Sequence, residues 1–235
     1  MKPITLFCLP FAGGNKYSYR EYEKRAPAFL RVVTLEYPGR GERVSEPFID
    51  DIEQITADLY LRIKGRVDET RYAIYGHSMG ALVAFLLAKM LISNGHRPPE
   101  HLFVSGTTGP SAPSRIGRQW HLLPKTDFIE KIKELEGLPE DALANQEILD
   151  YFEPILRSDF KTNENYVYKP GTPISVPLTV MTGTEEKMEL KDIYLWQKET
   201  TRNVKFLQLR GNHFFIYKWP AEIVRTISSE LFEHA

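Results

Sequence analysis

The chain alternates short apolar runs with segments of helical spacing, and this alternation limits the folds open to it. Runs rich in Val, Ile, Leu, Phe and Tyr are expected to be strands, at 4–9, 31–37, 72–75, 101–106, 177–182 and 204–209. Helical spacing falls between or after them, at 17–29, 52–66, 79–91, 191–200 and 220–232. Strands that are apolar throughout are typical of parallel sheets, which helices cover on both faces. The sequence therefore predicts an α/β fold with a mostly parallel sheet covered by helices on both faces.

One segment, residues 121–160, interrupts this alternation. It contains two amphipathic helical patterns, 127–137 and 145–160, with no run that reads as a strand between them. Pro139 can open a helix at its first turn. Packing helices would explain the pattern, but an insertion into an otherwise regular fold favours a lid over an active site. We therefore expect residues 1–235 to form a single domain with a helical lid insertion at approximately 121–160.

Composition excludes several classes of partner. The chain has 30 Lys and Arg against 31 Asp and Glu, so no global field draws it to nucleic acid or to an anionic membrane. Cys8 is the single cysteine, which excludes an internal disulfide or a cysteine-based zinc site and fits the reducing cytoplasm. The run at 4–9 is too short for a secretory signal, and Lys89 interrupts the longest other apolar stretch. We expect a cytoplasmic protein with no nucleic-acid partner, membrane partner, metal or cofactor.

Residues 76–80, Gly-His-Ser-Met-Gly, lie directly between an expected strand and an expected helix. This is the G-x-S-x-G pattern in the strand–turn–helix context that gives it meaning. Gly76 and Gly80 leave room for strand and helix to approach, and the turn presents the Ser78 hydroxyl at a helix N-terminus, where the dipole favours developing negative charge. The strand, the turn and the helix all fall where this motif requires them, so a coincidental match is the weaker interpretation. We therefore predict that Ser78 is a nucleophile.

His213 follows the last expected strand and precedes the last expected helix. A serine hydroxyl needs a base to take its proton, and an imidazole has a pKa near the working pH. His77 adjoins the serine but is expected to point elsewhere on a sharp turn. The remaining histidines flank a connection, begin the insertion or lie in the tail: His96, His101, His121 and His234. A surface role is the alternative for His213, but its place in the chain order predicts the general base.

Phe11-Ala12-Gly13-Gly14 follow the first expected strand and can complete such a site. A tetrahedral intermediate needs backbone N–H donors aimed at its oxygen. Met79 N–H is one expected donor, and the other is expected from Phe11 or Ala12, with the glycines permitting close approach of the substrate. A phosphate-binding loop is the rival interpretation, but neither G-x-G-x-x-G nor G-x-x-x-x-G-K-[ST] is present.

Five segments in this order, "LPFAGG", "YPGRGER", "GHSMGA", "GLPEDAL…EPILRSDF" and "GNHFF", resemble the type II (external, repair) thioesterases of nonribosomal peptide and polyketide synthases. The resemblance implies the α/β-hydrolase fold, without the first strands of the complete hydrolase sheet. It implies a serine hydrolase that removes acyl or aminoacyl groups from the phosphopantetheine arms of carrier domains, with acylated peptidyl or acyl carrier proteins as partners. A carboxylesterase or acyltransferase on the same fold remains an alternative, and so does a non-catalytic binding protein.

The resemblance also bears on the third catalytic group. In these thioesterases the acid is typically an aspartate in a G-x-x-D pattern, which matches residues 183–186 here and so implies Glu186. α/β-Hydrolases use either acid. Asp192 is the first alternative, although its place at an expected helix start predicts a cap. Further alternatives are a weakened Ser–His dyad or one of three other acids, Glu185, Glu189 and Asp159, the last of which is expected to fix the exit of the insertion.

Arg40 and Arg43 lie in the "YPGRGER" segment. Either side chain can bind a phosphate group, but a Pro-Gly turn with flanking charges is commonly structural. The structural interpretation is the one we expect.

Overall fold

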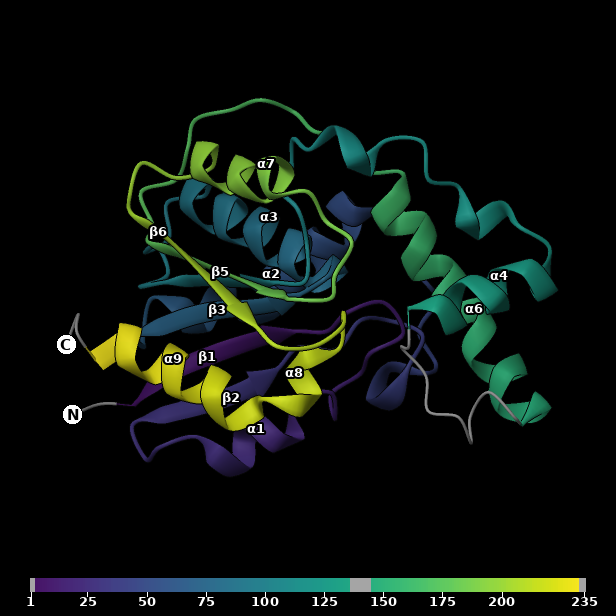
Figure 1. Cartoon of the computed structure of the whole chain (residues 1–235). Coiled ribbons are helices and arrows are strands. Elements are labelled where there is room, and N and C mark those ends of the chain that lie inside the picture. The colour runs from purple at the N-terminus through teal and green to yellow at the C-terminus, as the bar shows by residue number, and fades with distance from the viewer. Residues whose placement is uncertain (1–2, 136–144, 233–235) are drawn as a thin grey trace.

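The computed structural model of the protein describes residues 3–135 and 145–232. Its six strands form one sheet in the order β2-β1-β3-β4-β5-β6, and every neighbouring pair is parallel. The strands are β1 (Ile4–Leu9), β2 (Leu30–Thr34), β3 (Tyr72–His77), β4 (Leu102–Ser105), β5 (Leu178–Gly183) and β6 (Val204–Leu209). The predicted α/β class with a parallel sheet is confirmed (Figure 1).

Helices cover both faces of the sheet, as Figure 1 shows. One face packs on α2 (Ile52–Val67) and α3 (Met79–Ser93), and the other on α1 (Arg20–Arg25), α8 (Phe215–Lys218) and α9 (Pro220–Phe232). The central strands β1, β3, β4 and β5 are buried along their whole length, whereas the edge strands β2 and β6 are partly exposed. Burial on both faces explains why the central strands read as unbroken apolar runs. No helix among the described residues combines the length and apolarity that crossing a membrane requires.

Two expected helices are shorter than their sequence patterns. The 17–29 pattern yields only α1, because Ala26 precedes a proline and takes an extended conformation (φ -64°, ψ 132°). The 191–200 pattern yields α7 (Leu190–Ile193) followed by a 3₁₀ helix, Tyr194–Lys198. The residue before a proline ends the first helix, and the backbone changes from α to 3₁₀ geometry in the second, so neither pattern forms the continuous helix that its spacing predicts.

The segment between β4 and β5 contains no strand among its described residues. It contains α4 (Lys125–Glu134) and α6 (Gln146–Glu164), which lie beside the sheet in Figure 1. The side chain of Asn145 caps α6 by accepting the N–H of Glu147 at 3.0 Å, and the helix runs four residues beyond the expected end at 160. The two helices share a small apolar cluster of their own, built on Phe128, Ile132 and Leu156. Pro139, the expected helix start, lies outside the described residues.

Candidate active site

Ser78 lies on a strained turn between β3 and α3. Its φ of 56° makes it the single non-glycine residue with positive φ in the described part of the chain. The flanking glycines are required by close approach: a Cβ on Gly76 would lie 2.1 Å from the carbonyl oxygen of Gly80, and a Cβ on Gly80 would lie 2.2 Å from that of Leu9. Ser78 N–H donates to the carbonyl of Ser105 at 2.8 Å, which ties the turn to the next strand. This geometry is the one expected for an exposed nucleophile.

His213 lies in the loop between β6 and α8, where it meets Glu186. Nδ1 of His213 is 2.6 Å from Oε1 of Glu186. The second carboxylate oxygen accepts the N–H of Gly183 at 2.7 Å, so both oxygens of Glu186 are engaged. The side chain of Glu186 is 5% exposed and that of His213 is 20% exposed. Because an ionised carboxylate only accepts hydrogen bonds, Nδ1–H of His213 donates to it and Nε2 is left free to accept a proton.

The alternative acids lie elsewhere. Asp192 is buried inside α7, and no hydrogen bond in the described structure joins its side chain to His213. The expectation that Asp192 caps a helix is wrong, because Glu189 occupies the cap position and no side chain bonds the free N–H groups there. Glu185 and Glu189 are exposed. Of the candidate acids, Glu186 is the one whose carboxylate contacts His213 in the described structure.

Asp159 was expected to fix the exit of the insertion, and it does tie the end of that segment to the body of the fold. It lies within α6, is fully buried, and accepts the N–H of Gly13 at 2.7 Å. It also forms a two-pronged ion pair with the buried guanidinium of Arg40. No local signal in the sequence marks this contact, because 146 residues separate Gly13 from Asp159.

The expected oxyanion loop forms a tight turn at Phe11–Gly14, in which Gly14 N–H donates to the carbonyl of Phe11 at 2.9 Å. Ala12 N–H has no hydrogen-bond partner among the described residues. Met79 is the first residue of α3, so its N–H has no partner within the helix. Ala12 and Met79 both line a cavity that also reaches Ser78. Phe11 instead contributes its ring, which packs edge-to-face on Phe214.

An apolar cavity adjoins Ser78 and His213. Residues of the inserted segment form one wall, and the oxyanion loop and the loop after β6 form the other. Its apolar lining includes Phe11, Ile132, Leu135, Leu156, Phe160 and Phe214. In the described part of the chain, no group of three or more His, Cys, Asp or Glu side chains is arranged to hold a metal ion.

His77 bonds to Ser105 and packs on His213, and this role was not predicted. It is fully buried, its Nδ1 is 2.8 Å from Oγ of Ser105, and its ring centroid is 4.8 Å from that of His213. Burial lowers the pKa of His77 well below its ordinary value, so the ring beside His213 stays neutral. Gly106 packs against it, since a Cβ there would lie 2.3 Å from the imidazole.

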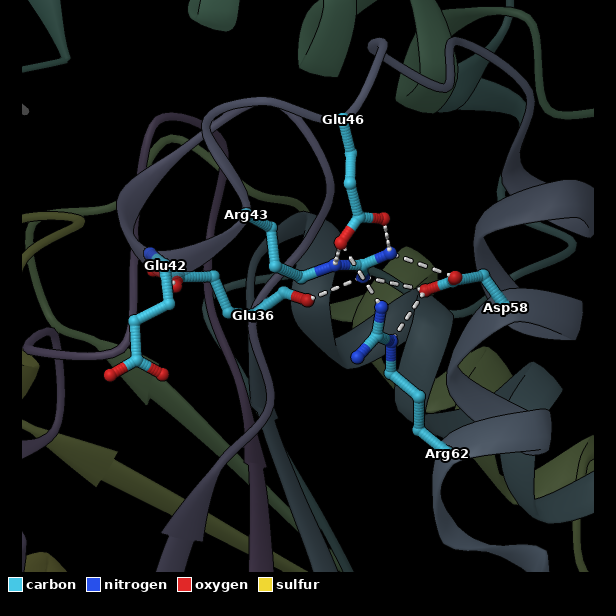
Figure 2. A network of polar contacts seen from close by, with 6 residues as sticks. All are labelled: Glu36, Glu42, Arg43, Glu46, Asp58 and Arg62. Atoms are coloured by element: carbon cyan, nitrogen blue, oxygen red, sulfur yellow. Dashed lines mark hydrogen bonds and ion pairs between the residues drawn. The ribbon is translucent and has the colours of Figure 1, made fainter.

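Arg43 is structural, as the Pro-Gly turn indicated. Figure 2 shows its guanidinium among carboxylates: it binds both oxygens of Asp58 at 2.7 and 2.9 Å, and it also binds Glu46. It donates to the carbonyl of Glu36 at 2.9 Å as well. Arg40, like Arg43, is engaged by a protein carboxylate.

Comparison with known proteins agrees with this geometry. Residues 4–231 match the family model for the thioesterase domain. The chain is 31% identical over 229 residues to the gramicidin S biosynthesis protein GrsT of Aneurinibacillus migulanus, covering 97% of this chain and 89% of that protein. It is 33% identical over 231 residues to thioesterase PikA5 of Streptomyces venezuelae, covering 97% and 81%. The solved structure of the type II thioesterase BorB from the borrelidin biosynthetic cluster is 30% identical, with a TM-score of 0.89 and coverage of 97% and 93%. The resemblance read from the sequence motifs is thereby confirmed, and the chain belongs to the thioesterase domain family.

Proposed function

We propose that this thioesterase works through Ser78 as nucleophile, His213 as general base and Glu186 as the acid that orients the base. The observation that carries the proposal is the 2.6 Å contact between Glu186 and His213, which lies at the same end of the sheet as the strained Ser78 turn. In a parallel sheet the carboxyl ends of all strands lie at the same end of the sheet, so the loops after β3, β5 and β6 converge there.

The reaction runs in two balanced steps. Nε2 of His213 takes the proton of Ser78 Oγ as that oxygen attacks the thioester carbonyl carbon. The tetrahedral intermediate collapses by breaking the C–S bond, and the imidazolium gives its proton to the leaving sulfur. Water, deprotonated by the same Nε2, then attacks the acyl ester, and the proton returns to Ser78 Oγ as the free acid leaves.

Backbone N–H groups of Met79 and Ala12 are the proposed oxyanion donors. Both residues line the cavity beside Ser78, and neither N–H is committed to a turn or helix hydrogen bond. Phe11 is the alternative donor: its N–H likewise has no hydrogen-bond partner among the described residues, but Phe11 does not line the cavity that Ala12, Met79 and Ser78 share. Removal of one such donor costs about 10²- to 10³-fold in kcat in other serine hydrolases.

The proposed substrate is an acyl or aminoacyl group on the phosphopantetheine arm of a carrier domain, cleared from a synthase of the nonribosomal peptide or polyketide type. Relatives named for gramicidin S and borrelidin biosynthesis support this class. In the same proposal residues 1–235 are one domain, and the insertion at approximately 121–160 is a lid whose apolar side faces the acyl group. The proposed setting is the cytoplasm, whose reducing conditions the single cysteine fits, and no cofactor takes part.

The test is a paired kinetic assay with one acyl group carried either by a carrier domain or by coenzyme A. Binding energy from the remote carrier can position the thioester and raise kcat as well as lower KM. We expect higher kcat/KM on the carrier domain, and no activity on either in Ser78→Ala. Equal efficiency on both would leave a general thioesterase, faster turnover of the matching oxygen ester would favour a carboxylesterase, and failure of a serine-directed phosphonate to label Ser78 would favour a binding protein.

A further inference from the structure

Asp159 joins three segments that are far apart in the sequence. It is 0% exposed and belongs to α6, outside the sheet. One carboxylate oxygen, Oδ2, accepts the N–H of Gly13 at 2.7 Å and also binds Nη1 of Arg40. The other, Oδ1, lies 2.7 Å from Nη2 of Arg40. A buried carboxylate that accepts three hydrogen bonds from two loops fixes those loops relative to its own helix.

Asp159 contacts the central peptide of the turn at Phe11–Gly14, the peptide between Ala12 and Gly13. The Phe11 carbonyl accepts Gly14 N–H, and Gly13 has φ of +81°, which together are the features of a type II turn. In a type I turn the central peptide, between Ala12 and Gly13, has the opposite orientation. Gly13 N–H belongs to that peptide, so its bond to Asp159 holds one of two orientations. The N–H of Ala12 belongs to the preceding peptide of the same turn; it has no hydrogen-bond partner among the described residues, and Ala12 lines the cavity beside Ser78.

Arg40 pairs with Asp159 and touches the same turn. A lone buried carboxylate is costly, but pairing with a guanidinium offsets much of that cost and preserves a strong acceptor. Burial is the largest influence on the pKa of Arg40 and acts to lower it, but the charge and hydrogen bonds of Asp159, together with nearby Tyr37 and Glu36, raise the pKa overall. Nη1 of Arg40 also reaches the carbonyl of Gly14 at 3.4 Å, and its guanidinium lies 5.3 Å from the Tyr37 ring centre.

The loop that carries Arg40 is itself held to the oxyanion loop. The carboxylate of Glu36 accepts the N–H of Lys16 at 3.0 Å and that of Glu42 at 2.7 Å, so it bridges the two loops. Figure 2 shows Glu36 beside the Arg43 network, whose partner Asp58 belongs to α2. The Arg40 loop is therefore fixed to the body of the fold, and α6 approaches it from outside.

We propose that Asp159 and Arg40 are a positioning pair that sets the orientation of the oxyanion turn, so that the placement of α6 determines how well Ala12 N–H stabilises the transition state. Neither side chain touches the reacting atoms. The inference rests on the proposed function, because it assumes that Ala12 is an oxyanion donor. It assigns to the inserted segment a role in the chemical step besides covering the substrate.

The test compares two carboxylate-to-amide changes, Asp159→Asn and Glu100→Gln. Glu100 forms a similar two-pronged pair with Arg71, at 2.6 and 2.7 Å. This pair lies where the chain enters β3 and β4, at the opposite end of these strands from Ser78. The amide in Asp159→Asn keeps the shape of the side chain but loses an acceptor. We expect this change to lower kcat by about 10- to 100-fold, since a misplaced oxyanion donor costs somewhat less than a deleted one. KM should stay within about threefold, because the donor acts on the transition state. Glu100→Gln should leave kcat unchanged.

A second readout separates positioning from stability. A boronic acid that forms a tetrahedral adduct with the serine should lose affinity for Asp159→Asn by about the same factor as kcat/KM falls, and keep it for Glu100→Gln. Unchanged kcat, a loss confined to KM, or lost kcat with full boronic acid affinity would overturn the inference. Should Asp159→Asn fail to fold, Arg40→Lys is the second variant, because it keeps the positive charge but cannot form the two-pronged pair. It must then lower kcat and boronic acid affinity together, by a smaller factor. Activity in Ser78→Ala would instead sink the proposed function, whereas an inactive Ser78→Ala beside a fully active Asp159→Asn would sink this inference alone.

Discussion

The site has an acid end, formed by Glu186 and His213, and an oxyanion end, formed by the turn at 11–14. The contacts that hold these two ends join residues at very different separations along the sequence. Glu186 and His213 are 27 residues apart, in the loops that follow the neighbouring strands β5 and β6. Gly13 and Asp159 are 146 residues apart, and Asp159 comes from a helix outside the sheet. The register of two paired strands is therefore enough to build the acid end. The oxyanion end is completed only when α6 is in place.

The difference extends to what each end depends on. Gly183, whose N–H holds Glu186, pairs with Leu209 in the parallel register of β5 and β6. A Cβ on Gly183 would lie 2.5 Å from the carbonyl of Gly211, so the two loops are in close contact. Movement of the inserted helices should leave this end unchanged and alter the oxyanion end. Substitutions that affect only one of the two ends test this difference.

The largest effect is expected at the two residues on which both ends act. Ser78→Ala and His213→Ala should each reduce kcat about 10⁴-fold or more, because the base has no function without the nucleophile. The double variant should be little slower than either single one, as steady-state kinetics on one thioester will measure. Strictly additive losses would contradict the proposal that the two residues act as one unit.

The acid end is tested by Glu186→Gln. The change preserves shape but removes the charge that favours the Nδ1–H tautomer of His213, and should cost roughly 10²- to 10⁴-fold in kcat. Asp192→Asn is the matched control, because it makes the same chemical change at the first alternative acid. We expect a much smaller effect there. If Asp192→Asn proves the damaging change and Glu186→Gln is silent, the acid end has been assigned to the wrong residue.

The contrast in range also explains what could be predicted from the sequence. The parallel sheet follows from the apolar runs, and Ser78 and His213 follow from their places at strand ends, where local spacing carries the information. Glu186 was implied by the family resemblance. The role of Asp159 follows from neither, because the pattern "LRSDF" reads as a helix and says nothing of which loop that helix meets. Arg40 was expected to be structural, but its partner could not be named from the sequence. The helices at 17–29 and 191–200 were predicted too long because amphipathic spacing alone shows neither the break before Pro27 nor the change from α to 3₁₀ geometry.

The smallest effect is expected from a pair of glycine substitutions that isolates the packing of α6 on the oxyanion turn. Gly13 and Gly117 have positive φ, +81° and +90°. A Cβ at Gly13 would lie 2.6 Å from Cδ2 of Leu156 in α6, whereas a Cβ at Gly117 meets nothing within 4 Å. Gly117→Ala should therefore show the backbone cost alone, about 1 to 2 kcal/mol in the free energy of unfolding. Gly13→Ala should cost about 1 to 3 kcal/mol more, because Leu156 must move or overpack. Urea unfolding of both variants measures the difference, and kcat should fall only for Gly13→Ala. Equal unfolding costs would mean that α6 yields freely at this contact, and the oxyanion end would then be no more dependent on the insertion than the acid end is.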